Sequence, residues 1–462
     1  MKQNMFKASY ETNSFVFINE EIKLNIEYED CEKFIWESLN EDIATVSDGV
    51  VKGINDGNVV IRVFPIDDTS IYYDFGVTVL NNNVPEIIKD LLKAHNSNIL
   101  LKKDFNVCNA YKTNIIESVS KFLFEDLNIN NDYLPLGKKK WENSEVSEYM
   151  KSIEFITVHY TANFRSGANA LAHANYFVSD THNTSIHYNT GNDGVFHCLD
   201  DNIRATHAGD SSGPEFEWVD TGIEYDGCDL LKVKVTVDES PYYYINGKKS
   251  IIRLPDTYSY RDEKTKHLIL DNGEIINELT KEKRNAESYF NKMGFRFKVI
   301  DGKYFMSKSW WCYSLVDEGR ICNVGGNRNS IGIESCVNEG SDLWYTWQIT
   351  AKLVAKLMKD NNLTIDRVVG HHFFTAKNCP APLLVNDLEL WHKFIELVEY
   401  EYLFLTKYEN YNIALININN DDVLENGRII DGNSGKFSYK LIILDKEKNK
   451  EFTIILYSIV RY

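Results

Sequence analysis

The sequence lacks the features that would place it in several large classes of protein. Its 462 residues include only 8 prolines and 8 cysteines, and positive charge is scarce: 50 Lys and Arg against 68 Asp and Glu give a net charge of −18. Nucleic acids bind basic surfaces, so we expect no nucleic-acid partner. No apolar run reaches the length of a membrane helix, and residues 452–460 are short and strand-like, so we expect no membrane partner.

The first residues and the cysteines bear on the compartment. Met1-Lys2-Gln3-Asn4-Met5 does not lead into the apolar core of a signal peptide, so we expect no export by the usual route. The cysteines have no framework spacing, which indicates mostly free, buried thiols of a reducing cytoplasm.

The chain is long enough for about two to four domains. Hydrophobic residues make up 43% of it, which is enough to form hydrophobic cores. Residues 1–83 alternate apolar and polar side chains between turn signals such as Asn55-Asp56-Gly57, which predicts an all-β domain. Residues 84–150 adopt helical spacing twice, at 87–92 and at 115–123, and predict a helical connector. Residues 401–462 return to strand-like runs and predict a small C-terminal β-module.

Residues 151–400 alternate between strand and helix patterns, which predicts an α/β fold with a mixed β-sheet flanked by helices. We expect strands at 154–160, 330–337 and 366–370, a β-pair around 192–194, and helices at 168–179 and 345–360. The last helix carries one apolar stripe typical of a core face, made of Thr350, Leu353, Val354, Leu357 and Met358. Residues 211–325 interrupt this unit with hairpin signals at 246–247 and 272–273, and an insertion of this length indicates a functional lobe or lid.

Three side chains within this unit predict a metal site. His159 ends the apolar run 155–160, His371 follows Val368-Val369-Gly370, and Cys379 comes eight positions after His371. Two imidazoles and one thiolate suit a tetrahedral, borderline-soft metal such as zinc. Three protein ligands leave a fourth position for water, as in catalytic sites. The set therefore predicts a hydrolytic zinc site.

Each of these residues has an alternative interpretation. His371 and His372 are adjacent, so only one can face the metal from an extended backbone; the spacing to Cys379 favours His371, and His372 stays open. Cys379 could be an inert buried thiol. Glu334 ends the apolar run 331–334, where a carboxylate is costly unless it points into a polar site; it could instead bind a neighbouring donor.

Several motifs occur in a recognisable order. They are Thr157-Val158-His159-Tyr160-Thr161, Ser185-Ile186-His187-Tyr188, His207-Ala208-Gly209, Gly326 to Glu334, and Lys377-Asn378-Cys379-Pro380. Over about 150 residues this order resembles the amidase-2 type of N-acetylmuramoyl-L-alanine amidase, in its phage and Gram-positive autolysin branch, which shares its fold with peptidoglycan-recognition proteins. Residues 36–63, from Trp36-Glu37-Ser38 onward, resemble a bacterial immunoglobulin-like domain.

The resemblance implies a role for each matching position. His159, His371 and Cys379 would bind Zn²⁺, Glu334 would be the general base for the attacking water, and Lys377 would stabilise the developing oxyanion. Two further residues, His187 and His207, match positions that line the substrate groove. They could contact the substrate or support the metal ligands, and a purely structural role stays open; Lys377 outside this motif would be an ordinary solvated lysine.

The resemblance also implies a substrate and a setting. The substrate would be peptidoglycan, cut at the amide between N-acetylmuramic acid and L-alanine of the stem peptide. The expected setting is a phage lysin or a virion-associated protein that acts on the bacterial cell wall, held in the virion with other virion proteins or in the host cytoplasm before release. The alternatives are a non-catalytic peptidoglycan-binding module and a structural virion protein. Cys379 favours the enzyme, because non-catalytic members of this fold lack that ligand.

Two departures from the family pattern concern the substrate rather than the metal. Thr206 stands where the family usually has Trp, and the insertion 211–325 lies next to the expected groove. We therefore hypothesise that the inserted lobe covers and regulates the site; unchanged activity and specificity after deletion of 215–320 would contradict this.

Overall fold

A computed structural model of the chain describes most of its length. The described residues are 6–8, 15–28, 31, 33–96, 98–102, 110–144, 147–179, 183–209, 218–228, 230–235, 242–253, 260–261, 268–269, 275–276, 293–307, 312–313, 318–321, 326–375, 378–385, 388–417, 427–429 and 435–461. Within these residues, no helix combines the length and the apolar character needed to cross a membrane.

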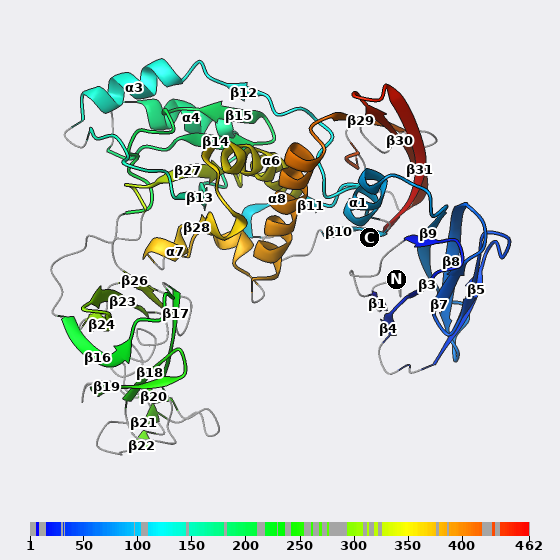
Figure 1. The fold of residues 1–462 in the computed structure, drawn as a ribbon, viewed down its shortest axis with the longest axis horizontal. Coiled ribbons are helices and arrows are strands. Elements are labelled where there is room, and N and C mark those ends of the chain that lie inside the picture. Colours follow the sequence, from blue (N-terminus) through cyan, green and yellow to red (C-terminus); the bar gives the residue numbers. More distant parts are fainter. Residues whose placement is uncertain are drawn as a thin grey trace.

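The centre of the molecule is a six-stranded mixed sheet with the strand order β12-β15-β14-β27-β13-β28 (Figure 1). Its strands are β12 (Ile129–Asn130), β13 (Phe155–Tyr160), β14 (Tyr188–Gly191), β15 (Gly194–His197), β27 (Ser330–Ser335) and β28 (Val368–Gly370). Both β27 and β28 run parallel to β13, and β14 runs parallel to β27. Parallel strands end at one edge of a sheet, so the residues that end β13, β27 and β28 meet there.

Helices cover both faces of this sheet, as the α/β prediction requires. The helices are α3 (Leu134–Glu142), α4 (Ala170–Val178), α6 (Leu343–Asn361), α7 (His372–Thr375) and α8 (Glu389–Lys407), with 3-10 turns at Ile365–Arg367 and Ala381–Leu383. On one face, Ile156 and Val158 of β13 join a single apolar core with α6 and α8. On the other face, Phe155 packs against Phe374 of α7.

Helix α6 shows why the sequence pattern was informative there. The five residues of its predicted stripe are all buried. The side chain of Asp342 caps its N-terminus by accepting a hydrogen bond from the backbone N–H of Trp344, and Asn362 ends it in the left-handed conformation with φ 53°. Local capping and the burial of the stripe agree, so the helix is fixed against the sheet.

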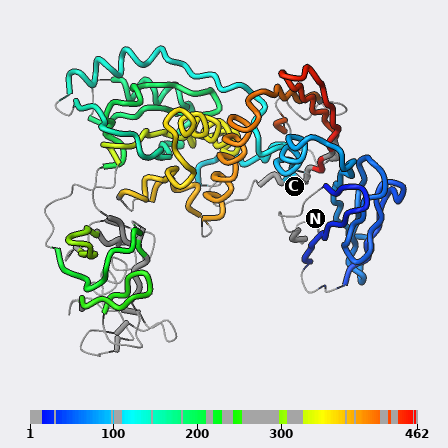
Figure 2. The backbone as a smooth tube through the Cα atoms, viewed as in Figure 1, coloured from blue at the N-terminus to red at the C-terminus, as the bar shows by residue number. Residues whose placement is uncertain are grey.

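The inserted lobe is a body of its own beside the central domain, built on an eight-stranded sheet (Figure 2). Its strands are β16 (Trp218–Glu224), β17 (Leu230–Val235), β18 (Tyr242–Ile245), β19 (Lys248–Arg253), β23 (Met293–Ile300), β24 (Lys303–Ser307), β25 (Cys312–Tyr313) and β26 (Glu318–Ile321), and a small sheet holds β20 (Tyr260–Arg261), β21 (Leu268–Ile269) and β22 (Ile275–Ile276). The hairpin predicted at Asn246-Gly247 is confirmed by β18 and β19. The signal at 272–273 lies outside the described residues.

The N-terminal segment is all-β, as predicted. It holds a four-stranded sheet of β2 (Phe15–Phe17), β5 (Phe34–Ser38), β8 (Gly57–Pro65) and β9 (Tyr73–Leu80), a three-stranded sheet of β3 (Glu21–Lys23), β6 (Ala44–Ser47) and β7 (Val50–Gly53), and the pair β1 (Phe6–Ala8) and β4 (Ile26–Tyr28). Side chains of both larger sheets, including Val51 and Phe75, share one core. The likeness of this segment to an immunoglobulin-like domain stays a prediction.

The predicted connector and the predicted C-terminal module share one sheet. Its order is β11-β10-β31-β30-β29, from β10 (Asn98–Lys102), β11 (Ile115–Ile116), β29 (Tyr411–Asn417), β30 (Gly435–Asp445) and β31 (Lys450–Arg461). Helix α1 (Glu86–Ala94) packs on it, which confirms the helix predicted at 87–92. The helical prediction for 115–123 is wrong: this segment begins with β11 and continues without a helix, because its apolar side chains pack into two different cores.

Helix α8 joins the central domain to this second unit. Its first half, with Leu390 and Phe394, packs into the core of the six-stranded sheet, and Phe404 near its end packs with α1 and the five-stranded sheet. The domain boundary that the sequence suggested at residue 400 therefore falls inside one continuous helix.

Candidate functional site

The predicted metal ligands converge at the carboxyl edge of the central sheet. His159 is the last buried residue of β13, and its Cα is paired with that of Glu334 on β27. Val158 is paired with Gly370 at the end of β28, so His371 follows at the level of His159. Paired residues of neighbouring strands point to the same face, which brings the carboxylate of Glu334 to the side of the sheet where His159 lies.

His159, His371 and Cys379 form a compact group of potential metal ligands. All three are buried, and their ligand atoms lie within 4.8 Å of one another. Cys379 Sγ lies 3.7 Å from His159 Nδ1. Adjacent nitrogen and sulfur corners of a zinc tetrahedron are about 3.5 Å apart, from bond lengths of roughly 2.0 and 2.3 Å. The donor types and this spacing both fit a zinc ion.

The segment that carries Cys379 is tied to the end of β28 by its backbone. The N–H of His372 donates to the carbonyl oxygen of Cys379 at 3.0 Å, and the N–H of His371 donates to that of Val158 at 3.3 Å. The ring of His372 packs against Trp391, with centroids 6.0 Å apart. The group of three ligand residues contains His371, the histidine favoured by its spacing to Cys379, and does not include His372.

Of the two predicted catalytic residues, the described part of the chain includes Glu334. Glu334 is half-buried, beside His159 in register. Lys377 lies outside the described residues.

His207 lies directly behind His159. Its Nδ1 is 2.9 Å from His159 Nε2, and its Nε2 is 3.2 Å from the carbonyl oxygen of Ser330. The side-chain oxygen of Asn327 accepts hydrogen bonds from the backbone N–H groups of His207 and Ala208 at 2.8 and 2.9 Å. Burial lowers the pKa of His207 well below its usual value, so the ring is neutral near pH 7.

His187 is completely buried, and both of its ring nitrogens meet backbone groups. The N–H of Gly332 donates to Nδ1 at 2.9 Å, and Nε2 lies 2.9 Å from the carbonyl oxygen of Ile203. Burial lowers its pKa to about 4. These contacts are consistent with the structural role that the sequence left open for His187, and its predicted place along the substrate groove stays a prediction.

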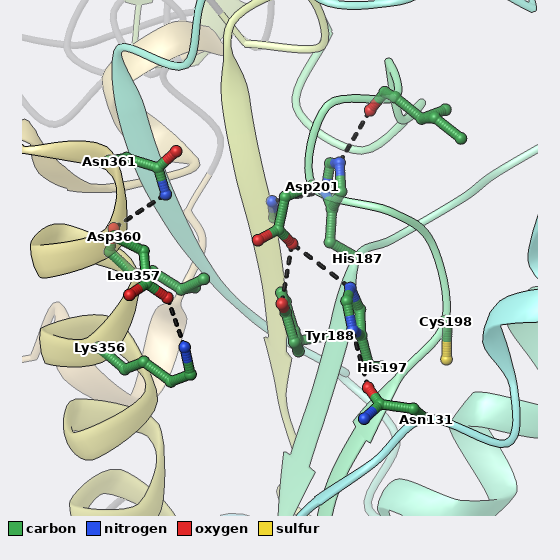
Figure 3. A network of polar contacts seen from close by, with 12 residues as sticks. Asn131, His187, Tyr188, His197, Cys198, Asp201, Lys356, Leu357, Asp360 and Asn361 are labelled. Atoms are coloured by element: carbon green, nitrogen blue, oxygen red, sulfur yellow. Dashed lines mark hydrogen bonds and ion pairs between the residues drawn. The ribbon is translucent and has the colours of Figure 1, made fainter.

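A second polar network, drawn in Figure 3, lies beside His187. Tyr188 donates to Asp201 at 2.8 Å, and His197 stacks on Tyr188 with centroids 4.1 Å apart while its Nε2 lies 3.3 Å from Asp201. Burial alone would raise the pKa of Asp201, but hydrogen bonds from His197 and Tyr188 outweigh it and lower the pKa. Sequence reasoning missed this network, because no local pattern pairs Asp201 with the other two residues.

An aromatic cluster lies at the same end of β13 and was also missed. Tyr160, the residue after His159, lies with its ring centroid 6.2 Å from that of Tyr111, and Tyr111 lies 5.9 Å from Phe164. Burial, and then the neighbouring Tyr111, raise the pKa of Tyr160. The only signal was the exceptional share of Tyr and Phe in the chain, 27 and 24 residues.

Comparison with known proteins identifies relatives of this region. A family model described as N-acetylmuramoyl-L-alanine amidase matches residues 149–244 and 246–382, just over half of the chain. The N-acetylmuramoyl-L-alanine amidase CwlH of Bacillus subtilis (strain 168) is 41% identical over 73 residues, 16% of this chain and 28% of that protein. CwlA of the same organism is 29% identical over 126 residues, 26% of this chain and 43% of that protein. The chain thus spans less than half the length of these curated relatives.

A solved structure described as a mutant endolysin from Bacillus subtilis is similar to this chain at 19% identity and a TM-score of 0.31. The match covers 59% of this chain and 99% of that one.

Proposed function

The chain belongs to the N-acetylmuramoyl-L-alanine amidase family, and from this premise we propose that it is a zinc hydrolase that cuts the amide between N-acetylmuramic acid and L-alanine in peptidoglycan. The observation that carries the proposal is the meeting of the ligand atoms of His159, His371 and Cys379 within 4.8 Å, with Glu334 paired to His159 on the neighbouring strand.

The proposed metal ligands are the two imidazoles and the thiolate. A zinc ion held there supplies Lewis-acid polarisation of the scissile carbonyl and of the attacking water. Burial of all three ligand residues supports tight binding, because a buried thiolate and two buried imidazoles are stabilised by a cation in their midst.

The other steps belong to side chains of this chain. The carboxylate of Glu334 would accept the proton of the attacking water and return it to the leaving nitrogen of L-alanine. Its position supports this role, since Glu334 is half-buried and pairs with His159 in register. Lys377 is proposed, from the sequence motif alone, to stabilise the negative charge that develops on the carbonyl oxygen.

The setting proposed for this reaction is the bacterial cell wall, with the protein serving as a phage lysin or a virion-associated wall-degrading protein. The support is the sequence resemblance to that branch and the presence of two β-rich units outside the region matched by the family model.

Zinc analysis joined to digestion of purified cell walls tests the proposal. We expect about one zinc per chain, with new amino termini and no new reducing sugar ends. Reducing ends instead would indicate cleavage of the glycan and contradict the amidase. Binding to the walls without cleavage, with zinc present, would favour the non-catalytic binding module.

The role of Glu334 is tested by Glu334→Gln, which keeps the shape and removes the base. We expect turnover to fall by roughly 10²–10⁴-fold with zinc retained. The matched control is Glu339→Gln, five residues further on, where the exposed glutamate forms an ion pair with Lys112 at 3.3 Å. Normal turnover in Glu334→Gln would reject the assignment.

A further inference from the structure

The hydrogen bonds of His207 decide which nitrogen of His159 is available to a metal. The carbonyl oxygen of Ser330 can only accept, so the N–H of His207 must be on Nε2, 3.2 Å away. His159 Nδ1 lies on the side of Cys379 Sγ, so a metal held there would take the lone pair of Nδ1 and leave the single N–H of the neutral ring on Nε2. His159 Nε2 then donates to His207 Nδ1 at 2.9 Å.

The consequence for His159 is a fixed tautomer. With its proton on Nε2, the lone pair of the ring is on Nδ1. This is the atom that lies 3.7 Å from Cys379 Sγ, on the side of the ligand cluster. Hydrogen bonds of this kind orient a ligating histidine and raise its basicity.

The surroundings hold His207 in place for this contact. The side chain of Asn327, which is buried, binds the backbone N–H of His207. Gly332 leaves room for the ring: a Cβ on this residue would lie 2.6 Å from His207 Nδ1, closer than real Cβ atoms approach. The strand that bears the proposed base thus has a glycine where the His207 ring crosses it.

We propose that His207 is a positioning residue rather than a substrate contact: through its Nδ1 it holds His159 in the tautomer that presents Nδ1 to the metal. The proposal deepens the proposed function and rests on the metal site described there. It reassigns a residue that the sequence motif placed in the substrate groove.

A matched pair of variants tests the contact. In His207→Asn the amide oxygen takes the place of Nδ1 and can still accept the hydrogen bond from His159 Nε2. In His207→Leu the side chain is close in size to histidine but has no hydrogen-bond acceptor. Zinc affinity is measured on the full-length chain by competition with a chelator. We expect zinc to bind roughly 10–100-fold more weakly to His207→Leu, with most of the affinity restored in His207→Asn. Equal affinity of His207→Leu and the unaltered chain would overturn the proposal.

A second measurement does not depend on any variant folding. Long-range proton–nitrogen NMR correlations of the zinc-loaded, ¹⁵N-histidine-labelled chain report which nitrogen of His159 carries the proton. A protonated Nε2 and a metal-bound Nδ1 are expected; the reverse assignment would overturn the proposal.

These readouts separate the inference from the function on which it rests. If the unaltered chain binds zinc and the variants behave as expected but walls are not cleaved, the amidase activity fails and the role of His207 stands. If walls are cleaved while His207→Leu keeps full zinc affinity, the role of His207 fails and the amidase stands.

Discussion

From Ile156 to His159, the two faces of the central sheet have opposite chemistry although they alternate along the same strand. On β13, Ile156 and Val158 enter the apolar core beneath α6 and α8, whereas Thr157 and His159 face the polar side. On that side four histidine rings follow one another: His187 and His207 have centroids 5.9 Å apart, His207 and His159 5.0 Å, and His159 and His371 4.7 Å. The comparison indicates that one face supplies the apolar core that stabilises the fold, while the other carries the buried polar groups of the candidate metal site.

The largest expected effect comes from removing a ligand on the polar face. Cys379→Ala leaves two protein ligands, so zinc should fall from about one per chain to near zero and wall hydrolysis to the level of the blank. Metal analysis and the digestion assay measure both. The control is Cys336→Ala, the same change at another buried free thiol, which should keep zinc. A Cys379→Ala chain that retains zinc and activity would remove the thiolate from the site.

A core truncation on the apolar face should do the reverse. Ile156 is fully buried, and Ile156→Ala leaves a cavity under α6, so we expect a loss of about 2–5 kcal/mol in the free energy of unfolding. Chemical denaturation measures it. Below the unfolding transition, zinc content and turnover should be unchanged; loss of zinc by the folded variant would show that the two faces are not separable.

The apolar side also holds a buried carboxylate, Glu401 of α8, which accepts a hydrogen bond from the N–H of Leu123 at 2.6 Å and lies 3.5 Å from Lys352 Nζ. Burial raises its pKa from 4.5 to about 7. The unfolded chain therefore releases this proton at lower pH than the folded one, so stability should fall as pH rises from about 4.5 to 7 and then level off. The total is on the order of 3 kcal/mol.

Glu401→Gln tests this pH dependence, because the amide cannot ionise. Thermal unfolding across pH 4–8 should show a flatter profile for the variant than for the unaltered chain. Parallel profiles would mean that Glu401 does not titrate in this range.

The smallest expected effect is on the polar face, two residues before His159 on β13. Thr157 Oγ1 and Ser330 Oγ are 2.5 Å apart in a buried hydroxyl pair. Thr157→Val keeps the shape and leaves one hydroxyl without this partner, which should cost about 1 kcal/mol with zinc binding unchanged. A drop in zinc affinity would extend the site-supporting region to this pair.

Much of the central domain could be predicted from local pattern. The strand at 154–160 could be predicted because a short apolar run is typical of a strand buried on both faces, as β13 is. Turn residues marked the β-pair around 192–194, and the apolar stripe marked the helix at 345–360. The proposed ligand residues could be singled out because His159 lies near the end of one apolar run and His371 directly follows another. The helical spacing at 115–123 misled because those side chains serve two cores rather than one face of a helix.

What the sequence determined by itself is the content of each face: the order of Ile156, Thr157, Val158 and His159 assigns core and site to opposite sides of whatever sheet the strand joins. Only the tertiary structure decided the partners. The parallel pairing of 98–100 with 459–461, the passage of α8 between two cores, and the contact of His207 with His159 join residues far apart in the chain. Such contacts leave no periodic signal, because their free energy arises between surfaces that exist only after folding.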